Sequence, residues 1–450
     1  MKRVHQVLAG LILLTAAPLW AQVGIMTAQS GSMSSDQMQT PPPVSGQAFS
    51  TEFTSEERSN YLRGGIAFLS AYTDNALGDV NGRPESDISY TVMPTVAWDR
   101  TTSRLNWVLS YAPGFTFYQR NSSRNEADQN ASINFEYRLS PHVTLSAGDG
   151  FQKSSNVFNQ LNPTSAAPVT GGSQDPNFSV FAPIADRLTN SANVGITYQF
   201  GLNGMMGASG SFGNLHYPYP TQVSGLYDSA GQAGGIFMSF RASQMHYFGA
   251  TYQYQRLLSY PSGISNETQT QAALFFYSFL PTKRLSFSLF GGPQYSDSSP
   301  ISLPQQSTTP EAKAWTPAVG ASWSWRGRVS SFAMSYSHVI SGGGGLYGAV
   351  HMDNASANVR QKITKALSGS LVGGYTNNNV LAGSIPFSNN GHTIQGTATL
   401  QQQFGQSLSL ILGYTRLHQT YANVQVISQT PDTNREFVSL SYQFSRPLGR

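Results

Sequence analysis

Residues 315 to 325 alternate strictly between two kinds of side chain. In order they are Trp315, Thr316, Pro317, Ala318, Val319, Gly320, Ala321, Ser322, Trp323, Ser324 and Trp325. One parity is mostly large and apolar, and the other is small or polar. A period of two places successive side chains on opposite faces of a β-strand, whereas a helix would need apolar residues three or four positions apart. This stretch therefore predicts a strand with one apolar and one polar face.

The same alternation recurs from about residue 60 to the end of the chain. Eighteen predicted strands begin near residues 61, 88, 105, 128, 143, 188, 204, 231, 245, 267, 285, 312, 329, 348, 367, 391, 408 and 434. Short turns such as 281–284 alternate with long connections such as 152–187. An even number of strands joined in this way is typical of bacterial outer-membrane barrels, whose short turns face the periplasm. We therefore predict an all-β fold, a transmembrane antiparallel up-and-down β-barrel of about 18 strands (16–18).

The composition of the 450-residue chain agrees with a barrel. Charged residues make up only 11%, against about 25% in soluble domains, while 43 residues are glycine and 12% are aromatic. One long apolar run occurs, at the N-terminus, so a bundle of membrane helices is excluded. The net charge of +4 is spread thinly along the chain, which argues against nucleic acid as a partner. Cysteine is absent, which excludes disulfides and thiol catalysis.

The first 21 residues have the features of a secretory signal peptide. Lys2 and Arg3 carry positive charge, an apolar stretch runs from Val7 to Leu14, and small residues precede an expected cleavage after Ala21. Residues 22–56 are polar and rich in proline, which predicts a flexible periplasmic leader. We expect a signal peptide at 1–21, a leader at 22–56 and an outer-membrane β-barrel at 57–450. The expected location is the cell outer membrane.

The last predicted strand, Val438 to Phe444, alternates apolar and polar residues and resembles the C-terminal recognition strand of outer-membrane barrels. We expect it to contact the barrel-assembly machinery. We also expect it to pair with the strand near 61–73, because exposed strand edges do not persist in lipid. Residues 445–450 follow Phe444, whereas such strands normally end in an aromatic residue. Outer-membrane lipid is the other expected partner, and the oligomeric state stays open.

One short motif resembles a known family. The stretch Ala71-Tyr72-Thr73-Asp74-Asn75 is followed by Ser86-Asp87-Ile88 and by an aromatic-rich pair of strands. These residues resemble the opening of outer-membrane β-barrel porins of the exopolysaccharide-associated type, over residues 61–155. Thr73 stands where an acidic residue is common in that family. The resemblance implies an outer-membrane barrel and brings no catalytic residues with it.

Residues that could support enzyme or metal chemistry are few. His338 and Ser341 precede a run of four glycines, Gly342 to Gly345, and a serine activated by a histidine is the nucleophile of outer-membrane phospholipases. By alternation, however, His338 belongs to the lipid-facing parity and Ser341 to the opposite one. The glycine run predicts a mobile extracellular loop. The histidines are scattered singly, so we expect no catalytic site, no metal site and no cofactor.

The parity opposite to the apolar one is dominated by serine, threonine, glycine, asparagine and glutamine, with few charges. Candidate pore-lining residues on it are Glu136, Arg138, Gln199, Arg360, Gln395, Gln401 and Gln403. Neutral hydrogen-bonding groups suit water and uncharged polar solutes, whereas strong ion selectivity needs rings of one charge. The sequence thus favours a porin-like channel for small or uncharged polar solutes, with a possible relation to saccharides or exopolysaccharides. The alternatives are a non-conducting structural or assembly barrel of an envelope polysaccharide system and, third, a phospholipase-like enzyme.

Overall fold

A computed structural model describes residues 60–76, 84–154, 185–219, 226–260, 265–282, 284–302, 312–381, 390–421 and 432–447. The predicted signal peptide, the predicted leader and most of the 152–187 connection lie outside the described residues. The described part holds nineteen strands and one short 3-10 helix. They are β1 (Tyr61–Thr73), β2 (Asp87–Thr101), β3 (Leu105–Tyr111), β4 (Gly114–Tyr118), η1 (Ser122–Arg124), β5 (Glu126–Arg138), β6 (Val143–Ser154), β7 (Arg187–Phe200), β8 (Gly204–His216), β9 (Asp228–Arg241), β10 (His246–Tyr260), β11 (Ser265–Thr282), β12 (Leu285–Ser302), β13 (Ala312–Arg326), β14 (Ser330–Gly343), β15 (Tyr347–Lys362), β16 (Leu367–Val380), β17 (Gly391–Phe404), β18 (Leu408–Tyr421) and β19 (Asp432–Pro447). None of the described helices is long and apolar enough to cross a membrane.

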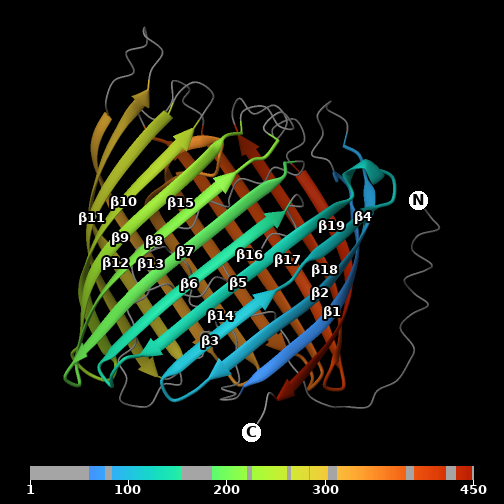
Figure 1. Cartoon of the computed structure of the whole chain (residues 1–450), viewed down its shortest axis with the longest axis horizontal. Coiled ribbons are helices and arrows are strands. Elements are labelled where there is room, and N and C mark those ends of the chain that lie inside the picture. Colours follow the sequence, from blue (N-terminus) through green and yellow to red (C-terminus); the bar gives the residue numbers. More distant parts are fainter. Residues whose placement is uncertain are drawn as a thin grey trace.

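The strands form one closed antiparallel ring in which each strand pairs with its neighbours in sequence (Figure 1). The segments β3 and β4 together occupy one position in the ring, because both lie between β2 and β5. The break between them falls at Ala112-Pro113, where proline has no N–H to give to a ladder. The ring therefore has eighteen positions, which confirms the predicted up-and-down barrel of 18 strands. The prediction was wrong in one detail, since it placed a single strand between the starts near 105 and 128, where the structure has β3 and β4.

The ring closes between the first and last strands. Thirteen residue pairs join β1 to β19, from Tyr61↔Pro447 to Thr73↔Arg435, and Figure 1 shows these two strands side by side. This pairing satisfies the backbone groups of both terminal strands, as a barrel in lipid requires. The prediction that the terminal strand pairs with the strand near 61–73 is confirmed.

The outer face of the ring is a continuous apolar surface. Large side chains on the outward parity are strongly exposed, among them Val194 (61%), Leu371 (59%) and Phe275 (69%), whereas inward residues such as Thr91 are buried. Soluble monomers rarely expose apolar surface on this scale. Transmembrane barrels expose an apolar band to the hydrocarbon of the bilayer, and they place aromatic rings at the two membrane boundaries. The outer face is therefore a lipid-facing belt.

Aromatic side chains mark both edges of this belt. Near the short turns, rings contact one another from strand to strand, as in Trp98–Trp107 (4.7 Å), Phe240–Phe248 (5.6 Å) and Phe287–Trp323 (6.0 Å). Toward the long connections, tyrosine hydroxyls donate to polar groups one step further along the wall. These bonds are Tyr336 to Asp353 (3.0 Å), Tyr414 to Asn434 (2.6 Å) and Tyr252 to Gln271 (3.2 Å). Such amphipathic rings settle at the headgroup level, so the tyrosines mark the extracellular boundary of the belt.

On the inner face, several aromatic rings lie flat over glycines of the neighbouring strand. A Cβ added to Gly207 would lie 2.4 Å from the ring of Phe237, and one added to Gly320 would lie 2.2 Å from that of Phe290. Phe437 covers Gly413 in the same way, at 2.1 Å. Glycine thus lets a large ring rest against the wall. Position 320, which alternation alone would offer as a free inward site, is covered by a ring.

The two faces can be compared at two glycines of adjacent strands. Gly396 on β17 points outward with nothing within 4 Å of an added Cβ, and Gly374 on β16 points inward with its nearest neighbour at 4.0 Å. We expect Gly396→Arg to lower the free energy of unfolding by about 2–4 kcal/mol, because its charge enters lipid. Gly374→Arg should cost clearly less, because its charge enters the polar interior. Denaturant titration in lipid vesicles measures both, and equal losses would contradict the lipid-facing assignment.

Candidate functional site

The inner wall is lined by hydroxyl groups that pair across neighbouring strands. Among the described residues, nine of these pairs join register partners. They are Thr91–Thr116, Ser110–Ser132, Thr268–Ser298, Ser278–Ser288, Ser286–Ser324, Ser335–Ser356, Ser370–Thr399, Thr397–Thr415 and Ser409–Ser441, at 2.5–3.1 Å. In each pair, one hydroxyl donates its hydrogen to the other. The remaining lone pairs of both oxygens can accept hydrogen bonds from water or solute in the interior. The wall is polar and largely neutral.

The seven candidate pore-lining residues all lie on the inward parity, but they do not form one cluster. One group lies near the short turns. On β5, Arg138 Nε lies 3.8 Å from Glu136 Oε1. On β7, the side-chain amide of Gln199 donates to the Gly201 carbonyl (3.4 Å). The other group lies on the far side of the ring. It consists of Arg360 on β15 and of Gln395, Gln401 and Gln403 on β17. The two groups therefore face each other across the interior.

The interior also holds charges that the sequence analysis missed. Arg63 and Asp99 form an ion pair of 3.2 Å near the short turns. Toward the long connections, Asp128, Arg187 and Arg435 are inward and buried. These residues lie close to the ends of their strands. Extending the alternating pattern by a few residues at each predicted strand end would have placed them on the inward parity. Inward charge is thus more frequent than expected.

One part of the inner wall is apolar. Met205, Phe237 and Tyr247 form one buried cluster against Leu280 on β8–β11. A second cluster, of Ala272, Leu274, Ala318 and Val339 with Phe290 and Met352, covers β11–β15. The remaining inner wall carries most of the polar candidates described above. The interior is therefore polar on all sides, with two apolar patches on β8–β15 among hydroxyl pairs such as Ser278–Ser288 and Ser335–Ser356.

The hairpin between β14 and β15 departs from the wall and crosses the interior. We call residues 339–349 the inner arm. The register of β14 with β13 ends at His338, and that of β15 with β16 begins at Val350, so the ladder of the arm runs only between β14 and β15. Ile340 is fully buried, and Ala349 is 1% exposed. The glycine run was predicted to form a mobile extracellular loop; that prediction was wrong, because the run is the buried tip of this arm.

The tip of the arm docks on β8 and β9. Tyr217 Oη donates to the Gly344 carbonyl (3.1 Å), and the Tyr227 N–H donates to the Gly345 carbonyl (2.9 Å). The tip belongs to a buried apolar cluster of Ala185, Leu215, Tyr217, Leu226, Leu346, Val350 and Tyr421. Since β8–β9 and β18 lie on opposite sides of the ring, this cluster bridges the interior at the end of the long connections.

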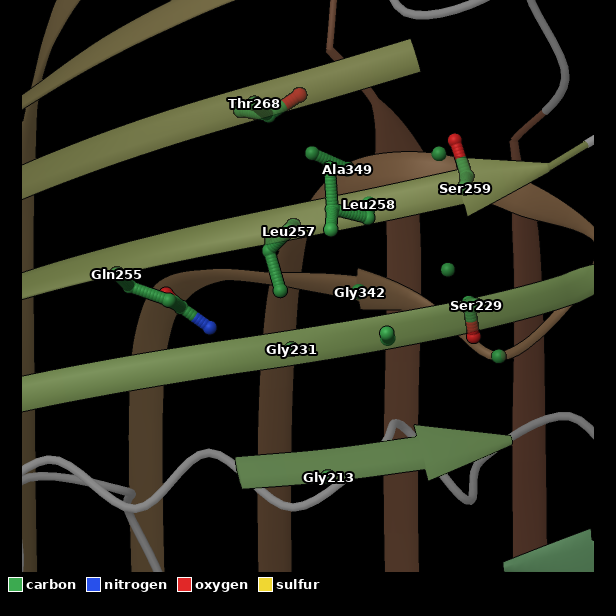
Figure 2. A pocket seen from close by; sticks show the side chains of 14 residues that line it. Gly213, Ser229, Gly231, Gln255, Leu257, Leu258, Ser259, Thr268, Gly342 and Ala349 are labelled. Carbon is green, nitrogen blue, oxygen red and sulfur yellow. The ribbon is translucent and has the colours of Figure 1, made fainter. Parts of the chain in front are cut away.

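The glycines of the tip are required by its geometry. Gly344 and Gly345 have φ values of 64° and 85°, in the left-handed region that glycine adopts without strain. A Cβ at position 345 would also lie 2.5 Å from the Tyr217 ring. Below the tip, a pocket separates the arm from the wall (Figure 2). Its lining includes Gly342 and Ala349 of the arm and Gln255, Leu257 and Ser259 of β10.

The residues considered for an enzyme site are not arranged as a nucleophile and its base. His338 Nδ1 bonds to Asp353 Oδ1 (2.8 Å) on the outer face, and its ring stacks on that of His351 at 5.8 Å. Ser341 is buried on the opposite parity, in the arm. Within the described residues, no group of three or more histidine and acidic side chains is placed to hold a metal ion.

The motif that carries the family resemblance closes the barrel at its extracellular end. Asp74 accepts hydrogen bonds from the N–H and the side-chain amide of Asn434 on β19 (2.8 and 2.7 Å). Asn75 donates to the Asp432 carbonyl (3.4 Å). Asp87 accepts from the backbone N–H groups of Arg120 and Asn121, both at 3.0 Å, and so fixes the chain after β4. These motif residues therefore hold the seam between β1 and β19 and its surroundings.

Removing the Asp74 carboxylate should weaken the seam. Asp74→Ala loses two hydrogen bonds to a charged acceptor, and we expect a loss of about 1.5–3 kcal/mol in the free energy of unfolding. The control is Asn125→Ala, which removes a single exposed bond from the Tyr118 N–H (2.9 Å) outside the lipid-facing belt and away from the seam. Denaturant titration of both variants is the measurement. A loss at Asn125 as large as that at Asp74 would contradict a special role of the seam.

Comparison with known proteins gives likeness at the level of overall structure. No family model matches the chain, and no curated protein matches its sequence. The crystal structure of Acinetobacter baumannii OccAB4 superposes with a TM-score of 0.42 at 8% identity, covering 87% of this chain and 99% of that one. The outer membrane protein opdK of Pseudomonas aeruginosa gives 0.40 at 9% identity (86% and 99% covered), and OpdO of the same organism gives 0.43 at 12% (86% and 97%). The closed ring, the lipid-facing belt and the polar interior make this chain a transmembrane β-barrel of the bacterial outer membrane.

Proposed function

We propose that the barrel is a passive channel for small, uncharged polar solutes. The observation that carries this proposal is the lining of paired hydroxyls inside a closed ring of eighteen strands, a size that encloses an aqueous lumen unless it is blocked. Near the short turns, Arg63 is paired with Asp99 and Arg138 lies beside Glu136. Opposite charges side by side give little net field, so ions of either sign are weakly selected.

Saccharides are the substrate class that this lining fits best. Hydroxyl and amide side chains exchange hydrogen bonds with sugar hydroxyls at little cost, because each group both donates and accepts. The motif resemblance adds a link to exopolysaccharide systems, which we include in the proposal. Outer-membrane lipid around the belt and the barrel-assembly machinery at Val438–Phe444 are the proposed partners.

The second candidate function is a non-conducting barrel that supports an envelope polysaccharide system. It is favoured by the inner arm, whose apolar cluster bridges the interior near the long connections. A phospholipase-like activity finds no support, because His338 and Ser341 lie on opposite parities.

The channel proposal predicts opposite effects for two neighbouring charges. In planar bilayers under a salt gradient, the wild type should conduct with a reversal potential near zero. Glu136→Gln should shift that potential toward anion preference and Arg138→Gln toward cation preference, because each leaves one inward charge uncompensated. The control is Glu436→Gln on the outward parity of β19, which should leave the potential unchanged.

Three outcomes would count against the channel. Current without these opposite shifts would mean that ions do not pass Glu136 and Arg138. If Glu436→Gln shifted the reversal potential as much as Glu136→Gln or Arg138→Gln, the same conclusion would follow. Reconstituted protein that stays silent, even when the inner arm is shortened, would favour the structural barrel.

A further inference from the structure

The inner arm has the construction of a hinged element. Its two strands pair with each other from Val339↔Met352 to Gly343↔Tyr347, while the flanking walls stop at His338 and Val350. At its base, the Leu381 N–H donates to the Ala349 carbonyl (3.0 Å), and the Ile340 N–H donates to Gln294 Oε1 (3.3 Å). A hairpin held by its own ladder can move as a unit about such a base without breaking that ladder.

The contacts that hold the arm across the interior are of a different kind from those of the wall. Two hydrogen bonds, from Tyr217 and Tyr227, reach carbonyls of the tip. Apolar contacts join Leu346 to the cluster that includes Leu215 of β8, Leu226 and Tyr421 of β18. Others join Ile340, Ala349, Leu381 and Leu257. Figure 2 shows the arm facing β8–β10 across the pocket. The arm is thus held mainly by apolar side chains, and a pocket lies between it and β8–β10.

We propose that the inner arm is a latched plug, which closes the lumen when it is docked on Tyr217 and Tyr227 and opens it when it is released. This inference rests on the proposed channel function and names its regulation. Moving the arm away would remove Leu346 from the cluster that bridges the interior. The ring itself would stay intact, because residues 339–349 have no register partner on β13 or β16 and pair only within the β14–β15 hairpin.

Because the chain contains no cysteine, a disulfide cross-link can form only between cysteines that are introduced. The backbones of Tyr227 and Leu346 lie close together, because the Tyr227 N–H bonds to the carbonyl of Gly345, the residue before Leu346. In the double variant Tyr227→Cys/Leu346→Cys, oxidation should abolish current and reduction should restore it. Each single variant should be insensitive to oxidant.

A second pair of variants loosens the latch. Gly345→Ala places a Cβ 2.5 Å from the Tyr217 ring, so it should undock the arm and raise the open fraction of the channel. Gly201→Ala is the matched control, because Gly201 also has a positive φ (68°) but nothing within 4 Å of an added Cβ. It carries the same backbone strain in a short turn without touching the arm.

A third measurement reports the position of the arm without any current. Leu257 packs against the arm, so a cysteine at this position (Leu257→Cys) should react slowly with a membrane-impermeant thiol reagent. Adding Gly345→Ala should speed the reaction, and adding Gly201→Ala should not.

The outcomes separate this inference from the channel proposal. Equal current in oxidised and reduced protein, with Gly345→Ala behaving as Gly201→Ala does, would overturn the plug and leave the channel standing. Silence of every variant, including Gly345→Ala with fast labelling at position 257, would overturn the channel and with it the role of the arm as a plug. Loss of current on oxidation together with faster labelling in Gly345→Ala is the expected result.

Discussion

The structure depends on one constraint, which is that no backbone N–H or C=O can remain unpaired in hydrocarbon. A sheet meets this constraint only by closing on itself. The pairing of β1 with β19 therefore removes the two edges that the sheet would otherwise leave open to lipid. The seam runs over thirteen residue pairs and ends at Asp74 and Asn75, whose side chains extend the contact to Asn434 and Asp432. The motif on which the porin resemblance rests thus serves closure of the barrel.

Closure also explains why each strand has one face suited to lipid and one face suited to water. Alternate side chains face lipid and lumen, so each strand must be apolar on one parity and tolerant of water on the other. The inner parity meets this need with hydroxyls that bond to each other across strands and with glycines that accept flat aromatic rings, as at Gly207 and Gly320. The high glycine content and the low charge noted in the sequence are two consequences of the same arrangement.

Alternation was sufficient to predict the fold from the sequence, because period two and turn length are local properties. It placed all eighteen strand positions, the seam and the inward parity of Glu136 and Arg360. It did not show the inner arm, since the glycine run Gly342 to Gly345 indicated only that the strand pattern stops there, and tertiary packing alone takes the hairpin inward. For the same reason it gave no sign that Phe290 covers Gly320. Parity says which side a residue faces, but it carries no information on what lies opposite.

The point at which the arm leaves the wall follows from the constraint that closes the barrel. Tyr336 lies at the extracellular edge of the lipid-facing belt, and His338, two residues further, is the last residue of β14 in register with β13. Beyond it, the register of residues 312–318 of β13 is with β12, and this segment includes Pro317, which has no N–H to satisfy. Water can solvate such an open edge, whereas lipid cannot. A hairpin of this barrel can therefore turn inward only above the membrane boundary, which is the height at which an element could control entry to the lumen without weakening the wall.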